Sequence, residues 1–206
     1  MNNHKIITID GPSGVGKGTL AKALAKHFNY KLLDSGAIYR LAALHCLKNN
    51  TNLDNETNVC TTLKNLSISF EINNEIRTEK TGMSASKIAA YPKVREILFQ
   101  KQQDFATDEG LVADGRDMGT VVFTNAKYKF FLDADTKITA QRRYKELESR
   151  GLNPDFETIL ADIEKRDYQD RNRKVAPLKP ADDAVIINTS HLSIKEVFGK
   201  VVSLIK

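Results

Sequence analysis

A glycine-rich loop near the start of the chain contains residues suited to binding phosphate. It reads GPSGVGKGT and lies between an apolar run, which predicts a strand, and the segment TLAKALAKHF, whose leucines repeat with the period of a helix. Glycines free backbone N–H groups to point at phosphate oxygens, the following helix adds the positive end of its dipole, and Lys17 can reach the β- and γ-phosphates. We therefore predict a nucleoside triphosphate site formed by Gly11, Pro12, Ser13, Gly14, Val15, Gly16, Lys17, Gly18 and Thr19.

The loop departs from the usual pattern directly after its lysine. A serine or threonine most often follows the lysine and contacts the metal ion that accompanies the nucleotide. Here Gly18 follows Lys17, and Thr19 comes one position later. Whether Thr19 contacts the metal or a phosphate is therefore open.

The rest of the chain offers no obvious group that would activate water to hydrolyse the nucleotide. A GTPase would carry the motifs Asn-Lys-x-Asp and Asp-x-x-Gly, and neither occurs in the sequence. An ATPase of the motor type usually has a glutamate after its second acidic strand end, but Asp114 is followed by Gly115, and Asp133 by Ala134. The phosphoryl acceptor is therefore expected to be a second bound molecule.

Several arginines are candidates for holding that acceptor, because a guanidinium makes paired hydrogen bonds to phosphate oxygens. They are Arg40, Arg116, Arg142, Arg143, Arg166, Arg171 and Arg173. The alternative is ion pairs on solvated helix faces, each worth at most about 1 kcal/mol, and for Arg142 and Arg143 both interpretations stay open. Arg116 lies between Asp114 and Asp117 at the end of a predicted core strand, where ligands bind in α/β sheets.

Short apolar runs predict the strands that position these residues. They are residues 6–9, 32–33, 111–113, 129–132 and 184–187, and helical patterns alternate with them. This alternation is typical of an α/β fold with a mostly parallel sheet. The phosphate loop then follows the first strand, and Arg116 follows the third.

Capping signals predict where several helices begin. Ser35 is expected to cap the second helix, and Ser193 with Glu196 forms a capping box for the last one. Pro154 is expected at the first position of a helix that runs toward Arg171.

Residues 50–108 differ in character from the rest of the chain, and we interpret them as an inserted lobe. The lobe begins with a polar stretch, and LSISFEI at residues 66–72 alternates with a period of two, which predicts a half-buried strand. A helix is predicted at residues 84–105, with Pro92 as a position where it can break. The charged segment 136–150 predicts a further helix after the lobe.

The composition is that of a globular protein without a targeting signal. The chain has 206 residues, of which 41% are hydrophobic and 28% charged, enough for one domain with a buried core. The net charge is +5, but basic and acidic residues interleave between Lys137 and Lys179, which disfavours nucleic-acid binding. We find no signal peptide and no run near the roughly 18 apolar residues of a membrane span. With only Cys46 and Cys60, these features favour a cytoplasmic location and no membrane partner.

Histidines and apolar helix faces give two further expectations. The four histidines are scattered and fall in no ligand spacing, so we predict no metal site made of side chains. No extra apolar helix face is evident, so we expect a monomer.

Five motifs follow one another along nearly the whole chain: GPSGVGKGT, LLDSGAIYR, ADGRDMGTVVF, FLDA and RDYQDRNRKVAPL. In this order they resemble bacterial cytidylate kinases, and GRDMGTVVF with RDYQDRNR is far more specific than the phosphate loop alone. The resemblance implies a single P-loop kinase domain over residues 1–206, with three layers and a parallel five-stranded sheet flanked by helices. It also implies an inserted lobe for the nucleoside monophosphate at residues 50–108 and a short lid at residues 136–155.

The resemblance also implies the reaction. Members of the family transfer the γ-phosphoryl group of ATP to CMP or dCMP with Mg²⁺, giving ADP and CDP or dCDP. ATP, CMP and dCMP are therefore the expected partners. Two alternatives stay open, namely a kinase of the same fold for UMP, AMP or a metabolite, and an RNA-binding regulatory protein with the same loop.

The matching motifs carry family roles to particular residues of this chain. Those that correspond to catalytic residues are Lys17, Arg116, Arg142 and Arg173. Those that correspond to the acceptor site are Ser35, Arg40, Ser86, Arg95, Asp114, Arg116, Asp117, Arg166, Asp170 and Arg173.

Within the acceptor site the implied roles differ. Three arginines hold the acceptor phosphate: Arg40, Arg116 and Arg173. Three residues read the cytosine: Ser86, Arg95 and Asp117. Arg166 and Asp170 lie near the sugar, Ser35 lines the CMP site, and Arg142 belongs to the mobile lid.

The insert departs from the family between about Leu66 and Ser86, where it is shorter than the family pattern implies. It keeps EIRT, from Glu75 to Thr78, but lacks about a hairpin of sequence before it. Whether the insert contains the family's three-stranded sheet is therefore open.

Overall fold

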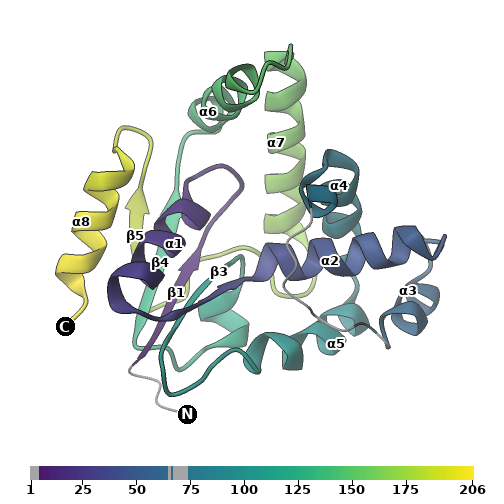
Figure 1. Ribbon diagram of the computed structural model, residues 1–206, viewed down its shortest axis with the longest axis horizontal. Coiled ribbons are helices and arrows are strands. Elements are labelled where there is room, and N and C mark those ends of the chain that lie inside the picture. The colour runs from purple at the N-terminus through teal and green to yellow at the C-terminus, as the bar shows by residue number, and fades with distance from the viewer. Residues whose placement is uncertain (1–4, 65, 67–73) are drawn as a thin grey trace. The chain divides into compact units, whose positions relative to one another are not determined.

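The structure is a computed structural model that describes residues 5–64, 66 and 74–206. The chain divides into two compact units, and Figure 1 labels their helices and most of their strands. The first, Met1–Leu32 with Thr107–Lys206, contains most of the sheet, and we call it the sheet unit. The second, Leu33–Ala106, is mostly helical, and we call it the helical unit. The proposed bounds of the inserted lobe and the lid remain predictions.

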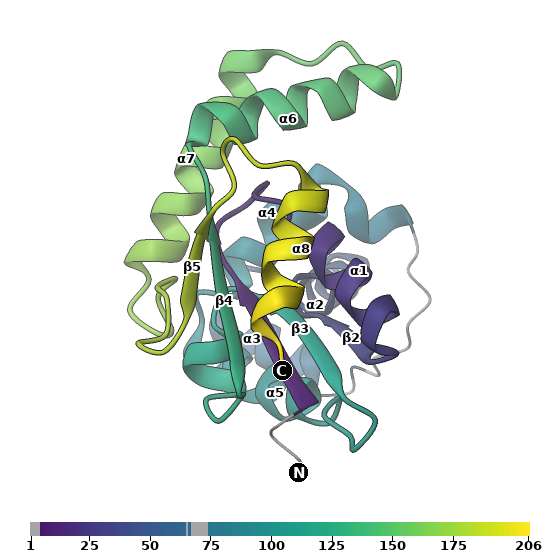
Figure 2. The same ribbon diagram turned by 90° about the vertical axis from the view of Figure 1, so that its left-hand side faces the viewer.

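Parallel strands form the centre of the fold, as their alternation with helices predicted. They are β1 (Ile6–Asp10), β2 (Lys31–Asp34), β3 (Leu111–Gly115), β4 (Tyr128–Asp133) and β5 (Val185–Asn188), in the spatial order β2-β3-β1-β4-β5 (Figure 2). The central strand β1 pairs in parallel with β3 and β4, and β4 pairs in parallel with β5. The five-stranded parallel sheet with its flanking helices confirms the predicted α/β fold.

The register of the sheet brings the carboxyl ends of β1 and β3 side by side. Asp10 lies opposite Gly115, just as Ile6 lies opposite Leu111. The phosphate loop continues from Asp10, and Arg116 follows Gly115, so both segments leave the sheet at the same edge. Open α/β sheets bind their ligands at this edge.

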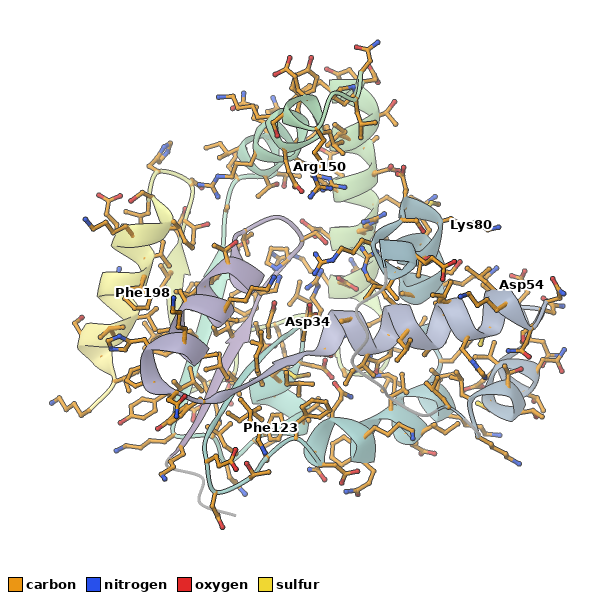
Figure 3. The ribbon with its side chains drawn as sticks, viewed as in Figure 1. Asp34, Asp54, Lys80, Phe123, Arg150 and Phe198 are labelled. Atoms are coloured by element: carbon orange, nitrogen blue, oxygen red, sulfur yellow. The ribbon has the colours of Figure 1, made fainter. Side chains whose placement is uncertain are left out.

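Helices α1 and α8 cover one face of the sheet (Figure 2). The helices of the sheet unit are α1 (Lys17–Phe28), α6 (Thr136–Ser149), α7 (Phe156–Asn172) and α8 (Ile194–Leu204), with a π-helical turn, η3 (Met118–Val122). Apolar side chains from both layers form the core: Ile7, Ile9, Leu20, Leu24, Val112, Leu132, Val197 and Val201. Phe198 of α8 also packs edge-on against His27 of α1, with ring centres 5.5 Å apart (Figure 3). Truncating a core leucine to alanine typically costs about 2–5 kcal/mol, so this core holds α1 firmly behind the phosphate loop.

The helical unit is a separate cluster of helices with its own core. Its elements are α2 (Ser35–Lys48), α3 (Glu56–Leu63), the 3₁₀ turn η2 (Asn74–Arg77), α4 (Glu79–Ile88) and α5 (Pro92–Gln103). Fully buried side chains from these helices form the core: Ile38, Leu63, Ile88 and Leu98. The predicted break at Pro92 is confirmed, because α4 ends before it and α5 begins at it. Of the predicted strand at residues 66–72, all but Leu66 lies outside the described residues.

The predicted cap of the second helix was wrong by one residue. Ser35 is the first helical residue of α2, and the N-cap is Asp34, which Figure 3 labels. The Asp34 carboxylate accepts a hydrogen bond from the N–H of Ala37 at 2.9 Å. Asp and Ser are equally good N-caps, so the local sequence could not separate them.

Two other helix starts also differ from the predictions. Helix α7 has Asp155 as its N-cap, and its carboxylate accepts from the N–H of Thr158, so Pro154 lies outside the helix. Helix α4 begins directly after its cap, Thr78, and not at Ser84. The predicted capping box of α8 is confirmed, and so is the charged helix α6. Among the residues that the structure describes, no helix is long and apolar enough to cross a membrane.

Candidate functional site

Three glycines give the phosphate loop a backbone conformation that other residues rarely adopt. Gly11 has a φ of 148°, Gly14 a φ of 77°, and Gly16, the N-cap of α1, a φ of 94°. A Cβ atom on Gly11 would lie 2.1 Å from the carbonyl oxygen of Leu132 in β4. The loop therefore passes directly over the backbone of β4, and only glycine fits at position 11.

Lys17 is the first residue of helix α1, and its side chain points back to the phosphate loop. Its Nζ donates a hydrogen bond to the carbonyl oxygen of Pro12 at 2.6 Å, and the residue is only 6% exposed. Burial and the nearby Arg116 guanidinium lower the pKa of Lys17 to about 8, against the opposing effect of the Asp114 carboxylate. The structure thus holds an amine at the centre of the loop, where a phosphate oxygen can replace the carbonyl.

Arg116 links the phosphate loop to helix α7. Its Nε donates to Oδ2 of Asp170 at 2.8 Å, and one terminal nitrogen donates to Oγ of Ser13 at 2.9 Å. Burial lowers the pKa of Arg116, but the charge and hydrogen bond of Asp170 raise it more, and the net direction is upward. A permanent cation therefore stands between the loop and α7.

Arg173 and Asp117 lie beside this pair. The guanidinium nitrogens of Arg173 are 3.8 Å from the carboxylate oxygens of both Asp117 and Asp170, and its Nε donates to the carbonyl oxygen of Ala176. Both side chains of the Arg173–Asp117 pair are largely buried. The structure therefore brings together four predicted site residues from two distant parts of the sequence: Arg116, Asp117, Asp170 and Arg173.

Helix α7 also contacts the phosphate loop directly. Oδ1 of Asp167 accepts a hydrogen bond from the backbone N–H of Ser13 at 3.2 Å. Burial raises the pKa of Asp167, although the hydrogen bond from Ser13 and the charge of Arg116 oppose this. Arg166, half-buried, precedes Asp170 by four residues, so the two share one face of α7.

Arg142 reaches the phosphate loop through Thr189. Its guanidinium donates to the carbonyl oxygen of Thr189, and Oγ1 of Thr189 donates to the carbonyl oxygen of Val15 in the loop at 3.2 Å. Its neighbour Arg143 pairs with Glu146 at 2.8 Å on the surface. The two adjacent arginines of α6 therefore have different environments, and only the Arg142 contacts lead to the loop.

A carboxylate occupies the space beside Gly18, where the usual loop carries a hydroxyl. A Cβ atom on Gly18 would lie 3.3 Å from Oδ2 of Asp114, at the end of β3. Carboxylate oxygens are ligands that Mg²⁺ prefers, and the ion usually takes its other ligands from water and substrate phosphates. The residues present therefore fit a Mg²⁺ ion bound with a nucleotide. Among the described residues, no group of three or more His, Cys, Asp and Glu side chains is placed to hold a metal ion by itself.

In the helical unit, Arg40 lies against the start of helix α4. One of its terminal nitrogens donates to the carbonyl oxygens of Ile76 and Thr78, at 3.0 and 3.2 Å. A Cβ atom on Gly82 would lie 2.8 Å from the other terminal nitrogen. Gly82 therefore leaves the space that the guanidinium fills.

The remaining predicted residues of the helical unit lie on three of its helices. Arg95 of α5 is buried, donates to the carbonyl oxygen of Ala89 at 3.2 Å, and lies 5.7 Å from the ring centre of Tyr39. Oγ of Ser35 on α2 donates to Oε1 of Gln102 at 2.9 Å. Ser86 is half-buried on α4.

Comparison with known proteins identifies the family of this chain. Residues 7–206 match the family described as cytidylate kinase. The chain is 49% identical over 220 residues to the cytidylate kinase of Pasteurella multocida, an alignment that covers 100% of this chain and 97% of the relative. It is 51% identical over 215 residues to cytidylate kinase 1 of Haemophilus influenzae, an alignment that covers 98% of this chain and 93% of the relative.

This chain belongs to the cytidylate kinase family. A solved structure of an uncharacterized protein from Eubacterium ventriosum is also similar in fold, with a TM-score of 0.55, 17% identity and coverage of 98% of each chain. The Pasteurella alignment spans 220 positions whereas this chain has 206 residues, so that cytidylate kinase has residues without a counterpart here.

The sequence analysis missed three residues that contact the phosphate loop or the turn after β3: Asp10, Asp167 and Thr189. Each makes a contact with a segment more than 100 residues away along the chain. The only local signal was an acidic residue, Asp10, at the carboxyl end of an apolar strand.

Proposed function

We propose that the phosphate loop and the arginines of the sheet unit transfer the γ-phosphoryl group of ATP to CMP or dCMP, giving ADP and CDP or dCDP. The contact of Arg116 with Ser13 on one side and Asp170 on the other carries this proposal. It joins the loop assigned to ATP to the residues assigned to the acceptor.

On the donor side, the loop amides and Lys17 bind the β- and γ-phosphates. The Lys17 amine already lies at the loop, so binding exchanges one carbonyl contact for phosphate oxygens. The negative phosphates favour the charged form of Lys17 and raise its pKa above the value of about 8 in the free protein. Its positive charge then stabilises the charge that builds up on the transferring group.

Mg²⁺ would lie beside Asp114 and Gly18. The ion neutralises charge on the β- and γ-phosphates when it is bound with ATP. The Asp114 carboxylate is the group of this chain that would hold the ion. Thr19 is exposed one position further along, and its contact with the metal stays a prediction.

On the acceptor side, Arg116 and Arg173 of the sheet unit and Arg40 of the helical unit bind the phosphate of CMP. A phosphate monoester is largely ionised near pH 7, because its second pKa is about 6, so the nucleophile needs no general base. The main task of the protein is to hold two anions in line and to balance their charge.

Base recognition is assigned to Asp117 together with Arg95 and Ser86. Cytosine presents an amino group at position 4, and a carboxylate accepts a hydrogen bond from it. Uracil presents a carbonyl there, which would face the Asp117 carboxylate with acceptor against acceptor. Arg166 and Asp170 share one face of α7, which supports their assignment to the sugar, and Ser35 is assigned to the lining of the CMP site.

The two alternatives have less support. Relatives about half identical over nearly the whole chain are named cytidylate kinases, which disfavours a UMP, AMP or metabolite kinase and an RNA-binding protein. A monomeric state and a cytoplasmic location remain predictions from the sequence.

The test is ADP formation with a panel of acceptors, namely CMP, dCMP, UMP, AMP and GMP at equal concentrations. We expect kcat/KM for CMP and dCMP to exceed the others by about 100-fold or more, because two mismatched polar contacts cost several kcal/mol. Equal rates with UMP would contradict the proposed base recognition. No ADP with any acceptor, together with salt-sensitive RNA binding, would favour the regulatory alternative.

A further inference from the structure

Asp10 is a buried carboxylate at the carboxyl end of the central strand, and both of its oxygens are hydrogen-bonded to the turn that follows β3. Oδ1 accepts from the backbone N–H of Met118, and Oδ2 accepts from the backbone N–H of Gly119, each at 2.8 Å. The residue is 4% exposed. These contacts join two segments 108 residues apart.

The turn that Asp10 holds is η3, and its first N–H groups have no cap of their own. The N-cap position is Asp117, and its side chain makes no capping hydrogen bond to the turn. Asp10 supplies that cap from the neighbouring strand. The Asp117 side chain is consequently not needed for capping and stays on the side of Arg173.

Gly119 shows how closely the turn approaches β1. A Cβ atom there would lie 2.9 Å from Oγ1 of Thr8 and 3.4 Å from Oδ2 of Asp10. The turn therefore lies directly on the strand, and small movements of the Asp10 carboxylate shift the backbone that carries Arg116 and Asp117.

We propose that Asp10 is a positioning residue: by holding the start of η3, it holds the preceding Arg116 and Asp117 in place relative to the phosphate loop and so sets the discrimination between CMP and UMP. This inference rests on the proposed function. Asp10 itself touches no substrate. It acts through the two residues that are assigned to the acceptor phosphate and the base.

Burial brings the pKa of Asp10 close to neutral pH. Burial raises the pKa of Asp10 to about 7, assisted by the charge of Asp117, while the two backbone N–H groups and Lys17 favour the ionised form. On the β4 side, the stem of Lys129 lies near Gly119 and its amine pairs with Asp183. Only the ionised carboxylate offers a full acceptor to both N–H groups, because a protonated oxygen becomes a donor.

Ionisation of Asp10 should therefore act on activity and stability in opposite directions. The turn is held best when Asp10 is ionised, so discrimination between CMP and UMP should increase as the pH rises through about 7. The stability of the folded chain should change in the opposite direction. Between its ordinary pKa of 3.8 and about 7, the folded chain binds more protons than the unfolded chain, so the free energy of unfolding should fall as the pH rises.

The first experiment compares the wild type with Asp10→Asn, which keeps the shape but sets an NH₂ group against one backbone N–H. We expect kcat/KM for CMP to fall about 10- to 100-fold, as for a lost charged hydrogen bond. The fall for UMP should be smaller, so that the CMP-to-UMP ratio narrows at least about fivefold, while KM for ATP changes little. Asp108→Asn is the control, because Asp108 is exposed and precedes the amino end of β3, whereas the site lies at the carboxyl ends of the strands; it should leave all of these constants unchanged.

The second experiment needs no variant, so it holds even if Asp10→Asn does not fold. The CMP-to-UMP ratio of kcat/KM is measured in the wild type from about pH 6 to pH 8, and the ratio cancels the titration of the acceptor phosphate because both acceptors share it. We expect the ratio to rise with pH, and to be flat in Asp10→Asn if that variant folds. A ratio independent of pH in the wild type, or equal losses for CMP and UMP in Asp10→Asn, overturns the inference. Failure of the wild type to phosphorylate CMP would instead overturn the proposed function.

Discussion

The carboxylate of Asp167 accepts a hydrogen bond from the backbone N–H of Ser13 at 3.2 Å, inside the phosphate loop. A carboxylate of the protein therefore accepts a hydrogen bond from an N–H group that could otherwise donate to a phosphate oxygen. It lies on α7, the helix that also carries Arg166 and Asp170, so the loop contact and these two assigned acceptor residues share one rigid element.

Removing this charge should strengthen the binding of ATP alone. Asp167→Asn keeps the size of the side chain and removes its repulsion of the triphosphate, and we expect Kd for ATP to fall about 3- to 10-fold, or roughly 1 kcal/mol. Asp162→Asn, on the same helix, is the control. Calorimetric titration without an acceptor measures both. Weaker ATP binding in Asp167→Asn would mean that the carboxylate supports the loop instead of competing with phosphate.

Lys17 should give the free protein a characteristic dependence of stability on pH. Its pKa is lowered from 10.5 to about 8 in the folded chain, so the unfolded chain binds more protons between these values. The free energy of unfolding contributed by Lys17 therefore rises with pH from about 8 to 10.5, by at most about 3 kcal/mol. Denaturant unfolding of the wild type and Lys17→Met across this range isolates the effect. If the free energy of unfolding changes with pH by the same amount in both proteins, the pKa of Lys17 is not lowered.

The segment of residues 136–155 should become more protected when both substrates bind. Closure excludes water from the γ-phosphate, and Arg142 is already linked to the loop through Thr189. Hydrogen exchange of this segment should slow when a bisubstrate analogue binds, whereas helix α8 should change little. Unchanged exchange at residues 136–155 would argue that this segment is not a lid.

Substituting Asp117 tests whether this residue recognises the base. Its carboxylate lies 3.8 Å from the guanidinium of Arg173, so the alternative is that Asp117 only orients that arginine. Asp117→Ala should lower kcat/KM for CMP much more than for UMP, because only cytosine donates to the carboxylate. The CMP-to-UMP ratio would then narrow by about 10-fold or more, since a buried unpaired group costs about 1–3 kcal/mol. A loss by the same factor for both acceptors would leave Asp117 with the structural role alone.

The fold could be predicted largely from local sequence, because short apolar runs at regular intervals leave few arrangements other than a parallel sheet. The five strands predicted for the parallel sheet are present, and the phosphate loop lies between β1 and α1 as its motif requires. The helix starts were less predictable. Asp34 and Ser35 are adjacent capping residues, and Asp155 caps α7 just after Pro154, so the sequence alone could not rank them.

The contacts within the site could not be predicted from the sequence in the same way. Ser13 and Asp167 are 154 residues apart, and Asp10 and Met118 are 108 residues apart. Such pairs depend on the register of β1 with β3 and on where α7 passes the loop, and neither is encoded in a local pattern. Acidic residues next to a phosphate site also run against a simple expectation of charge complementarity, so the sequence gives no indication that Asp10 and Asp167 contact the site.

The most direct test of the account follows the phosphoryl group itself. ATP labelled at the γ-phosphate is mixed with CMP and Mg²⁺, and the label is located after a single turnover and at steady state. We predict that it appears in the β-position of CDP, with one ADP formed for each CDP. Lys17→Met should remain folded and slow the transfer by about a thousandfold, which corresponds to about 4 kcal/mol. Label released as inorganic phosphate, or a Lys17→Met variant that keeps more than about a tenth of the wild-type rate, would contradict the central claim.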